Sequence, residues 1–233
     1  MLSVVNLHAY YGRAHILQGV SLEARAGEVV ALLGRNGAGK STTMKAIMGL
    51  VPPRPGEVSL EGQRIERLAP YRIARLGLGY VPEERRIFTD LTVMENLEVG
   101  RQPARDDAPE WDENKLFELF PNLGRMRERP GGRMSGGEQQ MLSIARTLMG
   151  NPKCLLLDEP SEGLAPIVVE QMAHAISELK AEGLCVLLCE QNLRFCQSIA
   201  DRLYIIEKGQ IRFGGNSVEL AGNPSLQEQY LSV

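Results

Sequence analysis

The sequence lacks any apolar run long enough to cross a membrane. A spanning helix needs about 20 consecutive apolar residues, and no stretch of the 233 residues approaches that length. Residues 1–6 contain neither a basic start nor an apolar core, so we expect no secretory signal peptide. We therefore predict a protein that stays inside the cell and reaches any membrane through a partner.

A strong charge of one sign is also absent. The formal net charge is -3 at pH 7 and the pI is near 5.8, which gives no overall attraction to nucleic acid or acidic lipid. Cysteine is scarce, and the spacing of Cys154, Cys185, Cys189 and Cys196 matches no common zinc pattern. We expect these four thiols to be buried and reduced.

What the chain does contain is a glycine-rich stretch between a predicted strand and a predicted helix. Residues 34–42 match the pattern G-x-x-x-x-G-K-[ST] of a phosphate-binding loop. The apolar run 29–33 before them is typical of a buried strand, and residues 42–48, closed by Gly49, are typical of a helix. Such a loop directs several backbone N–H groups and the positive end of a helix dipole at one point. The sequence therefore predicts nucleotide binding.

The residue types within this loop predict separate roles. Glycine lets the backbone close around phosphates where a Cβ would collide. We expect Lys40 to contact the β- and γ-phosphates and the Ser41 hydroxyl to ligate Mg²⁺. The loop residues predicted to bind nucleotide are Gly34, Arg35, Asn36, Gly37, Ala38, Gly39, Lys40, Ser41 and Thr42.

A second apolar strand ends in two carboxylates. Residues 154–157 are followed directly by Asp158 and Glu159. Ligands of α/β sheets bind at the carboxyl ends of the strands, so we expect this pair at the same edge as the phosphate loop. Asp158 can then hold Mg²⁺, directly or through water, and Glu159 can take a proton from an attacking water. The pair predicts hydrolysis in addition to binding.

The stretch Ser135-Gly136-Gly137-Glu138 predicts a second anion-binding helix start. Ser135 and Glu138 fit a capping box, but capping does not require Gly136 and Gly137, which are poor helix formers. Without side chains in the way, their backbone N–H groups can contact a phosphate. Because the first loop already binds its own nucleotide, we expect this helix start to contact the nucleotide of a second subunit across a two-fold interface.

Strands and helices alternate along the chain, except between about residues 90 and 150, where the pattern is mostly helical. The expected fold class is α/β: a P-loop NTPase core with a mainly parallel sheet, antiparallel β elements at the N-terminus and an inserted helical subdomain. We expect strands at 2–7, 16–24, 203–206 and 210–213, and helices at 70–76, 166–181 and 192–200. Residues 224–231 are a candidate closing helix.

Together, the loop at 34–42, the stretch 134–139 and the strand at 154–159 resemble the ATP-binding subunits of ABC transporters. The resemblance extends over nearly the whole chain. It implies one ATP-binding cassette at 1–233, with the core at about 1–85 and 150–233 and the helical insertion at about 86–149. It also implies that the chain hydrolyses ATP with Mg²⁺, and that two such subunits clamp two ATP molecules.

The same resemblance assigns further site residues. Tyr11 matches the aromatic residue that stacks on adenine, and Ser135, Gly136, Gly137 and Glu138 match the residues that contact the γ-phosphate in the partner subunit.

Three positions depart from the pattern of most relatives. Glu83 stands where most have a metal-contacting glutamine, and Gln191 stands where most have a histidine near the γ-phosphate. The loop 161–166 lacks the usual aspartate. Glu83 is able to ligate Mg²⁺. Gln191 can donate a hydrogen bond to phosphate but cannot carry a proton or a positive charge, so we hypothesise slower hydrolysis at this subunit's own site.

These departures resemble the LivF-type subunit of bacterial branched-chain (hydrophobic) amino-acid importers. That resemblance implies a second ATP-binding subunit, a different chain with a homodimer as the alternative, two membrane-spanning permease subunits, and indirectly a periplasmic binding protein. It implies a peripheral position on the cytoplasmic face of the bacterial inner membrane and no nucleic-acid partner. Related systems carry urea and amides, so a urea or amide importer is the alternative.

Two other classes of protein are possible. A non-transport ATPase of the same superfamily, acting on DNA or ribosomes, would have a long coiled-coil insertion or two tandem cassettes, and this sequence has neither. A small-molecule phosphotransferase or a GTPase would share the phosphate loop. However, no Asn-Lys-x-Asp guanine-reading motif is present, and such an enzyme has no use for the stretch 135–137.

Overall fold

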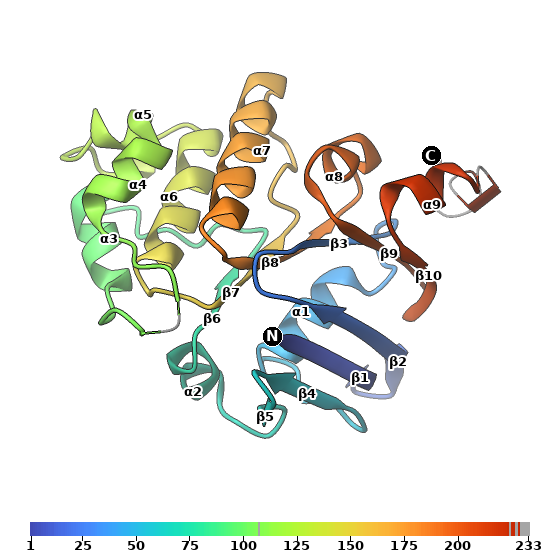
Figure 1. Ribbon diagram of the computed structural model, residues 1–233. Coiled ribbons are helices and arrows are strands. Elements are labelled where there is room, and N and C mark those ends of the chain that lie inside the picture. The colour runs from blue at the N-terminus through green and yellow to red at the C-terminus, as the bar shows by residue number, and fades with distance from the viewer. Residues whose placement is uncertain (107, 224, 227, 229–233) are drawn as a thin grey trace.

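The computed structural model describes residues 1–106, 108–223, 225, 226 and 228 (Figure 1). Within them, the N-terminal part forms an antiparallel sheet of order β2-β1-β4-β5. Its strands are β1 (Leu2–Tyr11), β2 (Ala14–Ala24), β4 (Glu57–Leu60) and β5 (Gln63–Arg64).

The second sheet has the order β10-β9-β3-β8-β7-β6 and carries the candidate site. Its strands are parallel except at the β9–β10 edge. They are β3 (Val29–Leu33), β6 (Leu78–Val81), β7 (Cys154–Asp158), β8 (Cys185–Glu190), β9 (Arg202–Glu207) and β10 (Gln210–Gly215). The predicted fold class is confirmed.

The six-stranded sheet, called the central sheet below, lies between two apolar cores. This position explains why the sequence of β3 is apolar throughout. Val29, Ala31 and Leu33 pack into one core with α7 (Pro166–Ala181) and α8 (Leu193–Ile199). Val30 and Leu32 pack into the other core with α1 (Lys40–Ile47) and the antiparallel sheet. Because side chains alternate across a strand and both faces are covered, no polar position is left in β3. Figure 1 shows α1 between the two sheets and α7 on the opposite face.

Between β6 and β7 the described elements are helical. They are α3 (Val93–Gly100), α4 (Glu113–Leu119), α5 (Pro121–Gly124), a 3₁₀ turn at Gly131–Arg133 and α6 (Gly136–Leu148). They gather on one side of the molecule (Figure 1). The domain boundaries at 86 and 149 remain a prediction.

The structure differs from the expected elements near the N-terminus. The strand predicted at 2–7 continues to Tyr11, because Tyr10 pairs with His15 and Tyr11 with Ala14. The turn between β1 and β2 therefore consists of Gly12 and Arg13.

The chain end also differs. An additional short helix, α9 (Ser217–Ala221), follows the Asn216 cap. The closing helix expected at 224–231 falls largely outside the described residues.

The remaining helix and cysteine expectations are met. The helix α2 (Pro70–Arg75) begins at the predicted proline, and α7 spans the predicted range. All four cysteines are buried and free of disulfides. Among the described helices, none combines the length and the apolar character that crossing a membrane requires.

Candidate nucleotide-binding site

The phosphate loop joins β3 to α1, as the sequence predicts, and its glycines are needed for two reasons. Gly39 precedes the first helical residue, Lys40, with φ of 113°, a conformation that a residue with a Cβ rarely adopts. A Cβ on Gly34 would lie 2.5 Å from the carbonyl oxygen of Ile206 on β9. The loop therefore lies directly against the central sheet.

Lys40 lies at the centre of the loop and is almost completely buried, at 3% exposure. Its Nζ donates to the carbonyl oxygens of Gly34 at 2.7 Å and Arg35 at 3.2 Å. It also forms an ion pair with Glu159 Oε1 at 3.1 Å. A buried ammonium needs such partners, and the arrangement holds the positive charge where the loop closes.

Glu159 follows β7 in a left-handed conformation, with φ of 49°, which is strained for a residue with a Cβ. Its backbone N–H donates to the carbonyl oxygen of Cys189 at 3.0 Å. Its Oε2 accepts a hydrogen bond from Nε2 of Gln191, the residue after β8, at 2.8 Å. The structure thus brings together the three predicted catalytic residues, Lys40, Glu159 and Gln191.

The neighbours of Glu159 set its charge. Burial would raise the pKa of this carboxyl, but hydrogen bonds with Glu162 and Gln191 and the nearby Lys40 ammonium outweigh burial and hold the pKa below its ordinary value. The contact with Glu159, together with burial, raises the pKa of Glu162 to about 7. Glu159 is therefore an ionised carboxylate at neutral pH, which is the form that a general base requires.

Asp158, the last residue of β7, is 1% exposed. Its Oδ2 accepts a hydrogen bond from the Tyr80 hydroxyl at 3.1 Å. Its Oδ1 is buried and has no hydrogen-bond partner among the described residues. Burial raises the pKa of Asp158, and the hydroxyls of Ser41 and Tyr80 offset part of that rise. A buried carboxylate oxygen without a partner, beside a serine hydroxyl, fits a Mg²⁺ ion.

The described residues contain no group of three or more His, Cys, Asp or Glu side chains able to hold a metal by themselves. A metal at Asp158 would therefore share its coordination with the hydroxyl of Ser41, with water and with nucleotide phosphate. Glu83, the third predicted metal ligand, is exposed after Pro82. Its charge contributes to the raised pKa of Glu162.

Glu190 is a site residue that the sequence did not suggest. It ends β8 and is 2% exposed. Its Oε1 accepts from the backbone N–H of Ser161 at 2.9 Å and its Oε2 from that of Gln191 at 3.1 Å. Burial raises the pKa of Glu190, and these bonds offset part of the rise. The carboxylate ties the loop after Glu159 to Gln191. The only signal in the sequence was an acidic residue closing an apolar strand.

The helix start at Ser135 has the predicted capping box. The backbone N–H of Ser135 donates to Glu138 Oε2 at 2.7 Å, and that of Glu138 donates to Ser135 Oγ at 3.3 Å. A Cβ on Gly136 would lie 2.8 Å from Arg85 Nη1, and one on Gly137 would lie 2.8 Å from Val168 Cγ1. Close packing is therefore a second reason for these glycines, beside the anion contact that the sequence suggested. Ser135 itself is exposed.

Tyr11, the predicted adenine-stacking residue, ends β1 with 49% of its side chain exposed. Its ring is available on the surface beside the turn at Gly12. Among the described residues, no hydrogen bond or ring contact joins Tyr11 to the loop at 34–42.

A groove of about 540 Å³ lies on another part of the surface, between α2, β6 and the ends of α3 and α6. Its lining includes four large apolar side chains that are half exposed: Leu50, Tyr71, Phe88 and Val99. The Phe88 ring stacks against the guanidinium of Arg146, with the ring centre 5.0 Å from Cζ. Contiguous exposed apolar patches of this kind are typical of interaction sites.

Comparisons with known proteins find a matching family model and similar chains. Residues 17–162 match the family model described as "ABC transporter". The chain is 43% identical over 231 residues to the high-affinity branched-chain amino acid transport ATP-binding protein BraG of Pseudomonas aeruginosa, covering 99% of both chains. It is 36% identical over 232 residues to the lipopolysaccharide export system ATP-binding protein LptB of Escherichia coli, covering 99% of this chain and 96% of that protein.

A solved structure is also similar. The ADP conformation of MJ1267, an ATP-binding cassette of an ABC transporter, matches with a TM-score of 0.81 and 30% identity, covering 96% of this chain and 93% of that one.

Proposed function

The chain belongs to the ABC transporter family, and from this premise we propose that it energises a bacterial importer of branched-chain or other hydrophobic amino acids. As a member of this family it is an ATP-binding transport ATPase. One observation carries the assignment of the reaction to particular residues: the cluster of Lys40, Glu159 and Gln191 beside the phosphate loop.

The reaction follows from the positions of these side chains. Lys40, which now contacts loop carbonyls, exchanges them for the β- and γ-phosphate oxygens when ATP binds. Glu159 takes a proton from water as that water attacks the γ-phosphorus, and the bond to the bridging oxygen breaks to release ADP and inorganic phosphate. Gln191 holds Glu159 by its hydrogen bond and, lacking a transferable proton, adds no acid of its own.

Ser41, Asp158 and Glu83 are the residues that would hold Mg²⁺. The unpartnered oxygen of Asp158 supports this assignment. When bound, the ion supplies positive charge that offsets the developing charge on the phosphates.

Tyr11 stacks on the adenine in this proposal, and its half-exposed ring is consistent with that role. The helix start at Ser135–Glu138 contacts the ATP of a second ATP-binding subunit, which is a different chain or a second copy of this one. The position of Ser135 supports this contact. Ser135 is exposed and caps the N-terminus of α6, where backbone N–H groups favour an anion.

The partners in the membrane are two permease subunits, and a periplasmic binding protein acts through them. We assign the groove lined by Leu50, Tyr71, Phe88 and Val99 as the surface that receives a cytoplasmic segment of a permease subunit. The exposed apolar side chains support this choice. The chain then works as a peripheral protein on the cytoplasmic face of the inner membrane.

The amino-acid substrate rests on similarity to BraG, at 43% identity, against 36% for the lipopolysaccharide exporter ATPase LptB. The test is to isolate the complex from native membranes, identify its subunits, and reconstitute it in vesicles with labelled leucine or urea. We expect leucine uptake that requires ATP and is lost with Lys40→Ala. Uptake of urea alone, or full leucine uptake by Lys40→Ala, would contradict the proposal.

A further inference from the structure

Arg85 lies beside the helix start at Ser135–Glu138, although the two are distant in the sequence. It belongs to the loop between β6 and α3. A Cβ placed on Gly136 would lie 2.8 Å from Nη1, 3.4 Å from Cζ and 3.5 Å from Nη2 of Arg85. The guanidinium therefore packs against the backbone of Gly136, in the space that a side chain at that position would occupy.

The main chain of Arg85 is tied to the same helix. Its carbonyl oxygen accepts a hydrogen bond from Ser143 Oγ on α6 at 2.6 Å, and its backbone N–H donates to the carbonyl oxygen of Pro82 at 3.0 Å. Its φ is 61°, a conformation that a residue with a Cβ rarely adopts. These contacts fix the position of Arg85 relative to the first turn of α6.

The charge of Arg85 is not balanced where it lies. A guanidinium carries five N–H donors and a permanent positive charge, yet in the described part of the chain this one forms no ion pair and no hydrogen bond. The acid of the same helix turn, Glu138, accepts the backbone N–H of Ser135 instead. The N-terminus of the 13-residue helix α6 is itself the positive end of a helix dipole. Two adjacent positive groups, one of them without acceptors, favour an anion.

The donors present indicate which anion fits. Arginine binds phosphate oxygens through two parallel N–H bonds, and backbone N–H groups at a helix start bind phosphate oxygens as well. The loop at 34–42 provides for the phosphates of the chain's own nucleotide, so the phosphate at α6 belongs to another molecule. In the function proposed above, that molecule is the ATP held by the second ATP-binding subunit.

We propose that Arg85 contacts the γ-phosphate of that ATP together with Gly136 and Gly137, and so supplies a positive charge from one subunit to the reaction in the other. This inference rests on the proposed function and adds to it a residue outside the stretch 135–138. Negative charge develops on the γ-phosphate oxygens as water attacks the phosphorus. The guanidinium offsets that charge and takes part in no proton transfer.

The test measures the ATPase activity of the complete complex, isolated from native membranes, with single substitutions in this chain. We expect Arg85→Gln to lower kcat at least about 10-fold, since an arginine supplied in trans gives larger factors still in other phosphoryl transfers. Arg85→Lys falls between Arg85→Gln and the wild type, because lysine keeps the charge but not the two-bond fork. Arg125→Gln removes an exposed arginine at the end of α5. It is the matched control for lost charge and keeps the kcat of the wild type.

A binding measurement separates contact with the γ-phosphate from damage to the fold. ADP lacks that phosphate, so calorimetry should find the same ADP affinity for the Arg85→Gln chain as for the wild type. A parallel loss of ADP affinity, equal loss of kcat in Arg125→Gln, or the wild-type kcat in Arg85→Gln would overturn the inference.

Ser135→Ala distinguishes this failure from failure of the proposed function, because it alters the helix start itself. If Ser135→Ala is slow while Arg85→Gln is as fast as the wild type, the inference about Arg85 alone is wrong. If both variants match the wild type, the helix start does not contact ATP, and both the inference and that part of the proposed function are wrong.

Discussion

At the scale of single residues, Glu159 is the side chain whose surroundings define the chemistry. Its carboxylate is held between the Lys40 ammonium at 3.1 Å and the Gln191 amide at 2.8 Å. Both contacts favour the ionised form, and the strained backbone of Glu159 fixes where it points. A base held in this way loses its function when the negative charge is removed, even if its shape is kept.

Replacing Glu159 by Gln should therefore slow ATP hydrolysis by on the order of 10²–10⁴-fold, the usual contribution of a general base. ATP binding should persist, so the variant should accumulate the ATP-bound dimer. Single-turnover hydrolysis and size-exclusion chromatography with ATP measure the two effects. Glu162→Gln, the same change three residues further along the chain, is the matched control and should hydrolyse ATP faster than Glu159→Gln. Rapid hydrolysis by Glu159→Gln would remove the role given to this carboxylate.

Gln191 supports a second prediction at this scale. An amide cannot take or carry a proton, whereas a histidine can do both near neutral pH. We expect Gln191→His in the assembled complex to hydrolyse ATP faster than the wild type. Steady-state turnover with both ATP-binding subunits present is the measurement. Equal turnover by the two proteins would count against the slow-site hypothesis.

Some of these residues could be identified from the sequence and others could not. Lys40 and Glu159 stand in local patterns whose spacing fixes their surroundings. Tyr80 and Glu190 act through contacts set by strand order, because β6 and β8 both lie beside β7. Local patterns do not give the order of strands in a sheet, so neither the bond from Tyr80 to Asp158 nor the bond from Ser161 to Glu190 could be predicted.

At the scale of helices and strands, the regular spacing of buried apolar residues was the reliable predictor of an element's range. The range of α7 was predicted because Met172, Ala175, Ile176 and Leu179 recur on one buried face. The strand β1 is longer than the sequence predicts, because its last residues, Tyr10 and Tyr11, are placed in the strand by their pairing with β2. The end of an edge hairpin is determined by pairing between its strands, and that pairing cannot be predicted from the local sequence.

Helix packing in the helical segment depends on Gly100, the last residue of α3. A Cβ at this position would collide with the carbonyl oxygen of Arg146 on α6. Gly100→Ala should therefore separate the two helices and destabilise the fold by about 1–3 kcal/mol, the usual cost of overpacking. Urea unfolding followed by circular dichroism measures this change. Gly222→Ala is the control, since its nearest neighbour would be in ordinary contact at 3.5 Å. Equal stability of the two variants would contradict the packing argument.

At the scale of the whole molecule, the groove beside α2 is assembled from distant parts of the chain. Leu50 follows α1, Tyr71 lies on α2, and Val99 lies on α3. Each is an ordinary apolar residue in the sequence, and only the fold brings them to one surface. For this reason sequence patterns predicted the nucleotide site but not the proposed site of contact with the permease.

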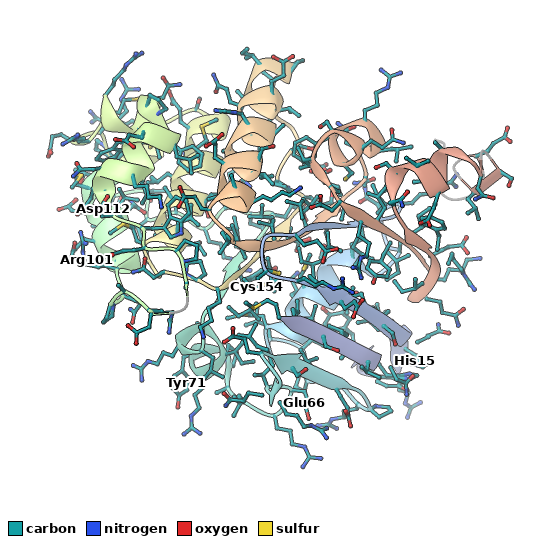
Figure 2. All side chains as sticks on the ribbon, viewed as in Figure 1. His15, Glu66, Tyr71, Arg101, Asp112 and Cys154 are labelled. Atoms are coloured by element: carbon teal, nitrogen blue, oxygen red, sulfur yellow. The ribbon has the colours of Figure 1, made fainter. Side chains whose placement is uncertain are left out.

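Tyr71 provides the test of that contact, because its ring is 56% exposed and lines the groove. Figure 2 labels it on the outer side of α2. Interface energy concentrates in a few exposed aromatic residues, and truncating one costs 2 kcal/mol or more, roughly 30-fold in affinity. Tyr71→Ala should therefore lose most of the permease that copurifies from native membranes, while its thermal stability stays close to that of the wild type.

Val218→Ala is the matched control for Tyr71→Ala. Within the described part of the chain, Val218 is the most exposed large apolar residue, at 81%, but it lies on α9, away from the groove. If nonspecific hydrophobic adhesion retained the permease, both variants would lose it to a similar degree. If the groove is the docking surface, Val218→Ala retains the permease and Tyr71→Ala does not. Equal permease recovery with the wild type and Tyr71→Ala would place the membrane contact elsewhere on the chain.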